Sequence, residues 1–416
     1  MPTAAFCTLG CKVNQYETEK IRAEMESLGF RTVSYPGPAD VLVVNSCTVT
    51  GAADAKSRAA VRRACRRNPN AVVVATGCSA ELDPLTFEQI DGVDMVIPNA
   101  DKTEIAERIA GRFPELPDNG RIKPRPRIRT RAIVKVQDGC NQFCAYCAVP
   151  LARPHMVSRN LGEIISEVQL LAGFGYKEIV LTGIRLGSYE AETATLPDLV
   201  FAVAEVGGIE RVRLSSIEVW EISSELIEAI KHPKVCRHLH VPLQSGSDDI
   251  LKEMRRPYNG GEYRSAIKTV RGTIDELALT TDVMVGFPGE TEEHFRQSYE
   301  FVKEMQFSRL HVFRYSPRPG TKAAEMPDST PPATRDRRSR ELIELGERLS
   351  GEFAERMVGT NVQVLVEKQR SRSSLLSGLT DNYVEVEFTG PEKRRGQIAE
   401  VYVTGRRGNL LIGGGE

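Results

Sequence analysis

Short apolar runs alternate with amphipathic segments over the first 112 residues of the chain. The runs are continuous in apolar residues, as in strands buried on both faces of a parallel sheet. They lie at 4–9, 40–45, 71–76 and 93–97. Between and after them, apolar residues at helical spacing predict helices over 17–28, 52–67 and 102–112. This alternation predicts an N-terminal α/β domain with a mostly parallel sheet.

The same alternation resumes at residue 132. Predicted strands lie at 132–136, 178–182, 211–215, 238–242, 280–285 and 309–313. Helical patterns lie between them, for example at 161–172 and 292–305, and a charged helix over 334–357 ends the series. Six βα units of this size predict a central βα barrel, partial or full.

The last sixty residues change character. Segments at 361–368, 383–390 and 398–405 alternate apolar and polar residues, which is the period of antiparallel strands with one buried face. These short strands predict a small C-terminal antiparallel β-barrel. The predicted domains are therefore an α/β domain at 1–120, a linker at 121–131, a βα barrel at 132–357 and a β-barrel at 358–416.

The linker has the sequence RIKPRPRIRTR, with six basic residues, two prolines and no acid. Proline disfavours helix and the charges repel one another, so we expect an extended segment. A solvated connector and a contact for phosphates both fit this composition.

Composition narrows the possible functions. The 416 residues carry a net charge of −1, so any nucleic acid must be bound through local basic patches. The chain has no apolar run of about 18 residues, which excludes a membrane-spanning helix. Its start lacks the basic and apolar pattern of a secretion signal, and we expect a cytoplasmic protein. Nine cysteines, an odd number, then favour metal or redox roles over a disulfide framework.

Three cysteines are close together in QDGCNQFCAYCAVP. Cys140, Cys144 and Cys147 have the spacing C-x3-C-x2-C and follow the predicted strand at 132–136. A 4Fe–4S cluster normally needs four thiolates, so three would leave one iron open. S-adenosylmethionine (SAM) can chelate an open iron through its amine and carboxylate, and one electron can then split it to a 5′-deoxyadenosyl radical. A structural zinc site would need a further ligand pair, and none is nearby.

Three other cysteines recur in a shared context. Cys11, Cys47 and Cys78 each follow an apolar strand run, and the carboxyl ends of parallel strands meet at one edge of a sheet. Gly10 and Gly77 precede two of them and permit close backbone approach. The pattern predicts a second cluster with another open iron. We expect no ligand role for the remaining cysteines: Cys7, Cys65 and Cys236.

The spacing around Tyr146 resembles the radical SAM signature, and further sequence motifs extend the resemblance to the methylthiotransferase family. These motifs are GCKVNQYE, NSCTVT, TGCSAELDP, LTGIRLGSY, RLSSIE, HVPLQSGSDDILKEMRR, DVMVGFPGET and YSPRPGT. In that family the order is an α/β domain, a radical SAM barrel and a C-terminal barrel resembling the TRAM RNA-binding domain. The first two motifs are most similar to those of the family branch that acts on N6-threonylcarbamoyladenosine. The chain departs from the family pattern at Arg185, in LARPHMVSR and at 79–81.

The resemblance implies a mechanism. The Cys140 triplet would hold the radical-generating 4Fe–4S cluster, and the Cys11 set an auxiliary 4Fe–4S cluster that carries sulfur. SAM would supply both a methyl group and the radical that removes hydrogen from C2 of the adenine at tRNA position 37. The implied partners are a tRNA anticodon stem-loop, an electron donor similar to flavodoxin or ferredoxin, and a sulfur donor. We expect a monomer.

Other residues are weaker candidates. Predicted contacts to SAM or to the target base lie at strand ends: Thr182, Gly183, Glu218, Gln244 and Ser245. A strand-end glycine also fits a turn, and a glutamate fits a solvated surface. Asp282 and Gly286 lie in DVMVGFPGE, where we expect the Gly-Phe-Pro-Gly segment to form a tight turn, and for Trp220 we expect core packing. Predicted tRNA phosphate contacts are the basic residues of the C-terminal barrel: Lys393, Arg394, Arg395, Arg406 and Arg407.

Two kinds of alternative remain open from the sequence. The same chemistry could act on isopentenyladenosine in tRNA or on an aspartate of a ribosomal protein. A protein of another class, a non-catalytic metal-cluster RNA-binding protein, would also use the cysteines and the terminal barrel.

Overall fold

The computed structural model describes residues 1–114, 116, 130–327, 330–369 and 375–414. The chain forms two units, and each is described by itself. The first unit comprises Met1–Arg127, Asp138–Val157 and Ser316–Ala324, and the second comprises Ile128–Gln137, Ser158–Tyr315 and Glu325–Glu416. Most of the predicted linker at 121–131 lies outside the described residues.

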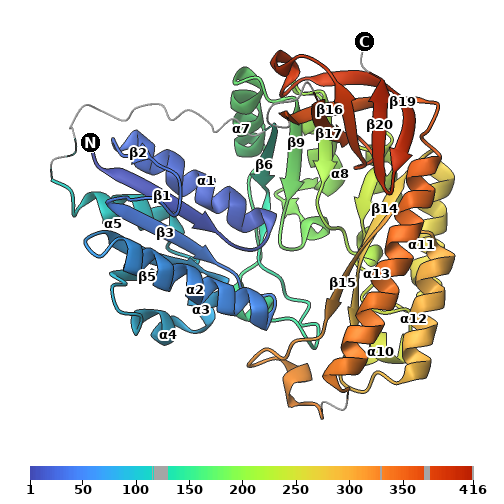
Figure 1. The fold of residues 1–416 in the computed structure, drawn as a ribbon, viewed down its shortest axis with the longest axis horizontal. Helices are drawn as coiled ribbons and strands as arrows, with labels where there is room; N and C mark the ends of the chain where they lie inside the picture. The colour runs from blue at the N-terminus through green and yellow to red at the C-terminus, as the bar shows by residue number, and fades with distance from the viewer. Residues whose placement is uncertain (115, 117–129, 328–329, 370–374, 415–416) are drawn as a thin grey trace. The chain divides into compact units, whose positions relative to one another are not determined.

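The first unit is built on a five-stranded parallel sheet with the order β2-β1-β3-β4-β5 (Figure 1). Its strands are β1 (Thr3–Thr8), β2 (Arg31–Thr32), β3 (Val41–Ser46), β4 (Val72–Gly77) and β5 (Met95–Ile97). Its helices are α1 (Lys12–Ser27), α2 (Gly51–Arg67), α3 (Cys78–Leu82), α4 (Pro84–Glu88), η1 (Lys102–Glu104), α5 (Ile105–Ala110) and α6 (Val149–Ala152). The parallel sheet predicted from the apolar runs is confirmed.

Alternation along β3 assigns the helices to the two faces of this sheet. Val41 and Val43 pack in one apolar cluster with residues of α1 and α5. Leu42 and Val44 pack in another with residues of α2 and α4. All four valine and leucine side chains are fully buried. A strand covered on both faces has no polar side, which explains its continuous apolar sequence.

The second unit contains six parallel strands in two groups, β12-β9-β6 and β13-β14-β15. Single bridges between Val212 and Val235 and between Ser216 and His240 connect the groups. The strands are β6 (Arg131–Lys135), β9 (Glu178–Thr182), β12 (Arg211–Leu214), β13 (His238–His240), β14 (Ala278–Val285) and β15 (Arg309–Arg314). The predicted partial βα barrel is confirmed.

Helices cover one face of these strands, and Figure 1 shows α11, α12 and α13 beside one another on that side. The helices are α7 (Leu161–Gly173), α8 (Leu196–Ala204), α9 (Ser224–Ile230), α10 (Asp248–Glu253), α11 (Gly260–Thr273), α12 (Glu292–Met305) and α13 (Pro332–Glu355). Short elements are β7 (Gln137–Asp138), β8 (Val157–Ser158), η2 (Leu186–Ser188), β10 (Glu190–Ala191), β11 (Ala194–Thr195), η3 (Val219–Glu221) and η4 (Lys322–Glu325). On β14, Leu279, Val283 and Val285 belong to the helix-covered core, so the alternate positions Thr280 and Asp282 lie on the opposite, concave face.

The C-terminal segment forms a closed five-stranded barrel with the order β16-β17-β18-β20-β19, which confirms the prediction. Its elements are β16 (Asn361–Gln369), β17 (Leu375–Thr380), β18 (Glu385–Thr389), η5 (Glu392–Arg394), β19 (Ile398–Arg407) and β20 (Leu410–Gly414). The sequence pattern missed β17 and β20, because LLSGLT and LLIGG do not alternate apolar and polar residues. In the described part of the chain, no helix combines the length and the apolar character that crossing a membrane requires.

Candidate functional site

The dispersed cysteines lie at equivalent places on three neighbouring strands of the first unit. Cys11 precedes α1 after β1, Cys47 follows β3 directly, and Cys78 begins α3 after β4. Because these strands are adjacent and parallel, their carboxyl ends meet at one edge of the sheet. Desolvation by the surrounding protein raises the pKa of the Cys11 and Cys47 thiols, and the neighbouring Cys78 raises the pKa of both further. The fold thus brings together three thiols separated by more than sixty residues in the sequence.

Two glycines let the backbone approach closely at this edge. Gly10 has φ +98°, and a Cβ there would lie 2.9 Å from both Cβ and Sγ of Cys47. Gly77 has φ +95°, and a Cβ there would lie 2.4 Å from Oδ1 of Asn45 and from the carbonyl oxygen of Ser46. Side chains at these positions would therefore be strained in backbone conformation and would clash as well.

The clustered cysteines lie on a single loop of the same unit. All three are half-buried, and the N–H of Gln142 donates to the Sγ of Cys140 at 3.4 Å. The loop closes at Gly139, where a Cβ would lie 2.0 Å from the carbonyl oxygen of His155. This compact arrangement leaves the thiols on a tight turn, as the short spacing predicts.

Neither cysteine set has the geometry of a site for one ion. A tetrahedral zinc with bonds of about 2.3 Å would hold its sulfur ligands about 3.8 Å apart. Across the residues that the structure describes, the one group of three His, Cys, Asp or Glu ligand atoms within 4.8 Å of one another contains no cysteine. Three thiols spread more widely than this suit a multinuclear iron–sulfur cluster.

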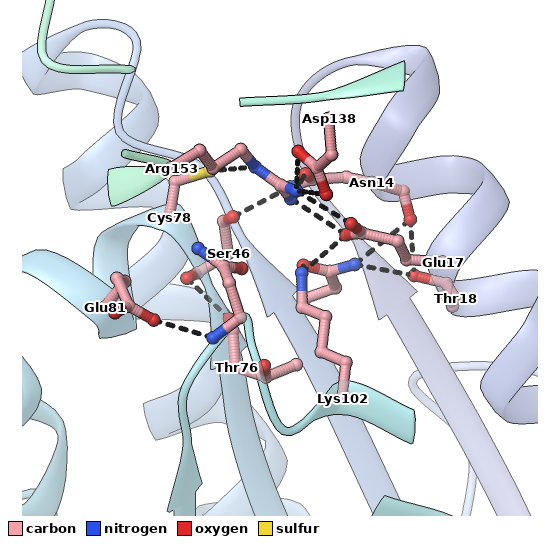
Figure 2. Close-up of polar contacts among 12 residues, drawn as sticks. Asn14, Glu17, Thr18, Ser46, Thr76, Cys78, Glu81, Lys102, Asp138 and Arg153 are labelled. Atoms are coloured by element: carbon pink, nitrogen blue, oxygen red, sulfur yellow. Dashed lines mark hydrogen bonds and ion pairs between the residues drawn. The ribbon is translucent and has the colours of Figure 1, made fainter. Parts of the chain in front are cut away.

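A buried ionic network supports Cys78 (Figure 2). The guanidinium of Arg153 donates to the Sγ of Cys78 at 3.3 Å. It also pairs with Glu17 and with Asp138, each at 2.8 Å, and its side chain is 2% exposed. Lys102 pairs with Glu17 at 2.5 Å. Burial alone would lower the pKa of Arg153, but Glu17, Cys78 and Asp138 outweigh it and hold that pKa well above its usual range.

This network connects the two cysteine sets within the first unit. Arg153 lies six residues after Cys147, directly after α6, whereas Glu17 lies on α1, whose N-cap residue is Cys11. Arg153, Glu17 and Lys102 are not among the site residues that the sequence predicts. A buried arginine between two carboxylates is decided by tertiary packing, so the sequence carries no local signal for it.

A third segment of the first unit, 316–324, contacts the regions around both cysteine sets. The N–H of Ala323 donates to the carbonyl of Ala145 between the clustered cysteines, at 2.7 Å. Arg318 is buried, pairs with Asp54 at 3.3 Å and bonds to the hydroxyl of Thr48 beside Cys47. Arg318 belongs to the motif YSPRPGT, so the structure gives this motif a contact beside Cys47.

In the second unit, the strand-end candidates divide into two kinds. Gly183 leaves room for Gln137, whose Oε1 would lie 2.9 Å from an added Cβ. Glu218 is paired with Arg256, and the hydroxyl of Ser245 bonds to that of Ser298 at 3.1 Å. Thr182 is buried at the end of β9, and its carbonyl oxygen accepts from the N–H of Val136 at 2.9 Å. These contacts give four of the candidates structural partners.

Gln244 differs from the other candidates. Its backbone adopts φ +65° and bonds to β14 through the carbonyl of Asp282 and the N–H of Met284. Its Oε1 is buried and has no hydrogen-bond partner among the described residues, as is also true of the hydroxyl oxygen of Ser215. Buried polar atoms without partners are rare in native proteins, so these two oxygens keep hydrogen-bonding capacity that the described residues leave unused.

One group on the concave face was not anticipated. Asp282 lies inside β14, as the strand predicted at 280–285 requires, and its Oδ1 is 3.3 Å from Nε2 of His240 and 3.1 Å from Nδ1 of His311. Burial favours a higher pKa for Asp282, but the two histidines outweigh it and hold that pKa below its usual range. These three ligand atoms are close enough to hold a cation. Adjacent strands create the group, so its members are far apart in the sequence.

Trp220 packs as expected, half-buried against the barrel core. It stacks on Tyr258 with ring centroids 5.6 Å apart, and the guanidinium of Arg256 lies 4.9 Å from its ring.

The basic residues of the C-terminal barrel lie on two segments. Lys393 and Arg394 belong to η5, with Arg395 next to it. Arg406 and Arg407 end β19, and both already have carboxylate partners, in Glu355 and Glu387 respectively.

Comparison with known proteins places this geometry in a family. Residues 134–302 match the radical SAM superfamily, and residues 3–98 match the uncharacterized protein family UPF0004. The threonylcarbamoyladenosine tRNA methylthiotransferase MtaB of Bacillus subtilis is 41% identical over 97% of this chain and 94% of its own length. The protein of that name from Aquifex aeolicus is 37% identical over 96% of this chain and 99% of its own length.

A solved structure supports the fold. The radical S-adenosylmethionine methyltransferase TsrM of Kitasatospora setae, with cobalamin and a 4Fe–4S cluster bound, is similar with a TM-score of 0.57 at 14% identity. The match covers 92% of this chain and 82% of that chain. The chain therefore belongs to the MtaB family of tRNA methylthiotransferases, within the radical SAM superfamily.

Proposed function

We propose that this protein methylthiolates C2 of N6-threonylcarbamoyladenosine at position 37 of tRNA, with SAM as methyl donor and radical source. The observation that carries the proposal is the presence of two separate sets of three cysteines in one unit of the chain. One set would be enough for radical generation. A second set is needed where sulfur has to be delivered as well.

The ligand roles follow from the donor atoms. Cys140, Cys144 and Cys147 would hold the radical-generating 4Fe–4S cluster, and the other set, Cys11, Cys47 and Cys78, the auxiliary one. When bound, the cofactors would supply the electron, the radical, the sulfur and the methyl group. Three thiolates add three negative charges to each site, and such charge needs compensation when it is buried.

The surrounding residues of the chain supply that compensation and orient the ligands. The guanidinium of Arg153 donates to Cys78 and is itself held by Glu17 and Asp138, so it places a positive charge beside the sulfur and fixes the orientation of the side chain. In the second unit, the unpartnered oxygens of Gln244 and Ser215 are available to the polar groups of SAM.

The choice of substrate rests on the relatives, both of which are named for threonylcarbamoyladenosine in tRNA and match over almost the full chain. As partners we propose the tRNA anticodon stem-loop, a flavodoxin- or ferredoxin-like electron donor and a separate sulfur donor, with the enzyme acting as a monomer. Isopentenyladenosine and a ribosomal-protein aspartate are the competing substrates.

Two measurements test the proposal. Anaerobically reconstituted protein with reductant and SAM should release 5′-deoxyadenosine, whereas a non-catalytic RNA-binding protein would release none. Nucleoside analysis of tRNA from cells lacking the gene should show loss of the methylthio group from threonylcarbamoyladenosine. Loss from isopentenyladenosine instead, or no change in tRNA together with loss from a ribosomal protein, would assign the competing substrates.

A further inference from the structure

The carboxyl-terminal half of α2 carries four exposed arginines, which we call the α2 stripe: Arg62, Arg63, Arg66 and Arg67. Their spacing of one, four and five residues keeps them on one side of the helix. The other side of α2 is buried through residues such as Val61, Ala64 and Cys65. In the part of the chain that the structure describes, no carboxylate forms an ion pair with any of the four, whereas Arg58 on the same helix pairs with Asp54.

The α2 stripe borders a groove of about 890 Å³ between α2 and the end of α4. Arg62, Arg63 and Arg66 line one side, and Gln89, Asp91 and Gly92 are among the residues of the other. Asp91 is the one acidic side chain among the groove's lining residues. Gly92 permits the close approach of the two walls, because a Cβ there would lie 3.0 Å from the Cβ of Cys65.

The stability of the fold gives no reason for this arrangement. Arg62 and Arg66 form a like-charge pair at four residues, as do Arg63 and Arg67, and such pairs destabilise a helix. The helix dipole favours cations only in the last turn, which accounts for Arg66 and Arg67 but not for the other two. The predicted basic surface of the C-terminal barrel differs, because Arg406 and Arg407 there are already paired with carboxylates.

The position of the stripe relates it to the cysteine edge within the same unit. The first turn of α2 lies near that edge, since Asp54 pairs with Arg318, which bonds to Thr48 beside Cys47. The far end lies at the opposite edge, where the side chain of Asn68 accepts from the N–H of Ala39 just before β3. At 1.5 Å per residue, the stripe lies about 16 to 24 Å along the helix from its first residue.

We infer that the α2 stripe binds the backbone phosphates of the double-stranded stem of the tRNA substrate, an inference that rests on the proposed function. A stem-loop that presents a loop base at the cysteine edge continues as a double helix away from it. The four arginines of the α2 stripe, about 16 to 24 Å along the helix, would then lie beside the phosphates of this double helix. The guanidinium group of Arg is well suited to bind phosphate oxygens. Because A-form stems are recognised through their backbone, the contact is independent of base sequence.

The test uses the full-length reconstituted enzyme and a transcript of its substrate tRNA. The variant R62Q/R63Q/R66Q/R67Q should bind this tRNA at least tenfold more weakly at moderate salt. The slope of log affinity against log salt should fall by about 3, since each lost phosphate contact removes about 0.7 to 0.9. The corresponding four-lysine variant retains the charges and should bind within a few-fold of the wild type.

The control removes four arginines that already have carboxylate partners on the second unit, in the variant R264Q/R296Q/R314Q/R337Q. It changes net charge equally and should leave the salt slope unchanged. Methylthiolation by the stripe variant should show a raised KM for tRNA with kcat preserved, and release of 5′-deoxyadenosine without tRNA should equal the wild type.

Two results would overturn the inference. An unchanged affinity and salt slope in the stripe variant would reject the stripe while leaving the proposed function intact. Wild-type enzyme that cleaves SAM but binds no tRNA would reject the proposed substrate and the stripe's partner together. Circular dichroism of both variants ensures that a lost affinity reflects lost charge rather than unfolding.

Discussion

The two cysteine sets reach similar chemistry by different means. Cys140, Cys144 and Cys147 lie within eight residues on one loop, so their proximity follows from the chain itself. The dispersed set exists only when three strands of a parallel sheet pair in register and two glycines adopt positive φ. The Cys140 set, on one loop, should therefore tolerate changes in the parallel sheet. The Cys11 set, at the edge of that sheet, should depend on the packing of its whole unit.

The largest effect should come from removing each set in turn. Wild-type protein reconstituted without oxygen should hold about eight irons, and each triple Cys→Ala variant about four, as two four-iron clusters require. Removal of the Cys140 set should abolish 5′-deoxyadenosine release. Removal of the Cys11 set should preserve that release but abolish methylthiolation. Four irons in the wild type, all lost with the Cys140 set, would leave no auxiliary cluster.

Arg153 tests whether the two sets share one support. Arg153→Met removes the buried ion pair with Glu17, which keeps only Lys102 as its printed cationic partner, and breaking such a buried pair costs about 3 to 5 kcal/mol of unfolding free energy. Denaturant unfolding of the cluster-free protein measures this loss. The exposed pair of Arg337 with Glu341 is the matched control, and Arg337→Met should cost no more than about 1 kcal/mol. Equal effects of the two substitutions would contradict a shared buried support.

Gly77→Ala sharpens the contrast between local and sheet-edge sites. The positive φ and the clash with Asn45 and Ser46 should destabilise the first unit by about 2 kcal/mol or more. Iron at the Cys11 set should fall while SAM cleavage by the Cys140 set persists. Gly272→Ala serves as the control, because Gly272 lies in α11 with no atom near an added Cβ. Loss of SAM cleavage in Gly77→Ala would mean that the loop depends on the sheet edge after all.

The smallest expected effect concerns pH. Burial favours a higher pKa for Asp54, but hydrogen bonds from Ser79 and Arg58 and the charge of Arg318 outweigh it and lower that pKa below its usual range. A lowered carboxyl pKa adds stability above the unfolded-state pKa, and this stability is lost as pH falls through the native one. Asp54→Asn should therefore cost about 1 kcal/mol at pH 7, given partial exposure. The difference between the two proteins should shrink as pH drops below about 4, as urea unfolding at several pH values can measure.

Much of this architecture follows from local sequence. Buried strands such as β3 have continuous apolar runs because both faces are covered, and the strand β19 alternates because one of its faces is exposed to solvent. The strand β17 does not alternate, and it forms because the neighbouring strands β16 and β18 supply its hydrogen bonds. The strand predicted at 280–285 ends at Val285 as expected, directly before Gly-Phe-Pro-Gly, but its pattern does not show that Asp282 meets two histidines.

The sequence by itself determined the residue types and the local spacings: the cysteine triplet, the strand-end cysteines, the glycines before them and the order of the domains. Only the tertiary structure decided which distant side chains meet. Arg153 reaches Cys78 and Glu17, Arg318 reaches Thr48, and His240 and His311 flank Asp282. The physical reason is that these are contacts between elements far apart in the chain, and strand pairing and burial, rather than local propensity, set the distances between them.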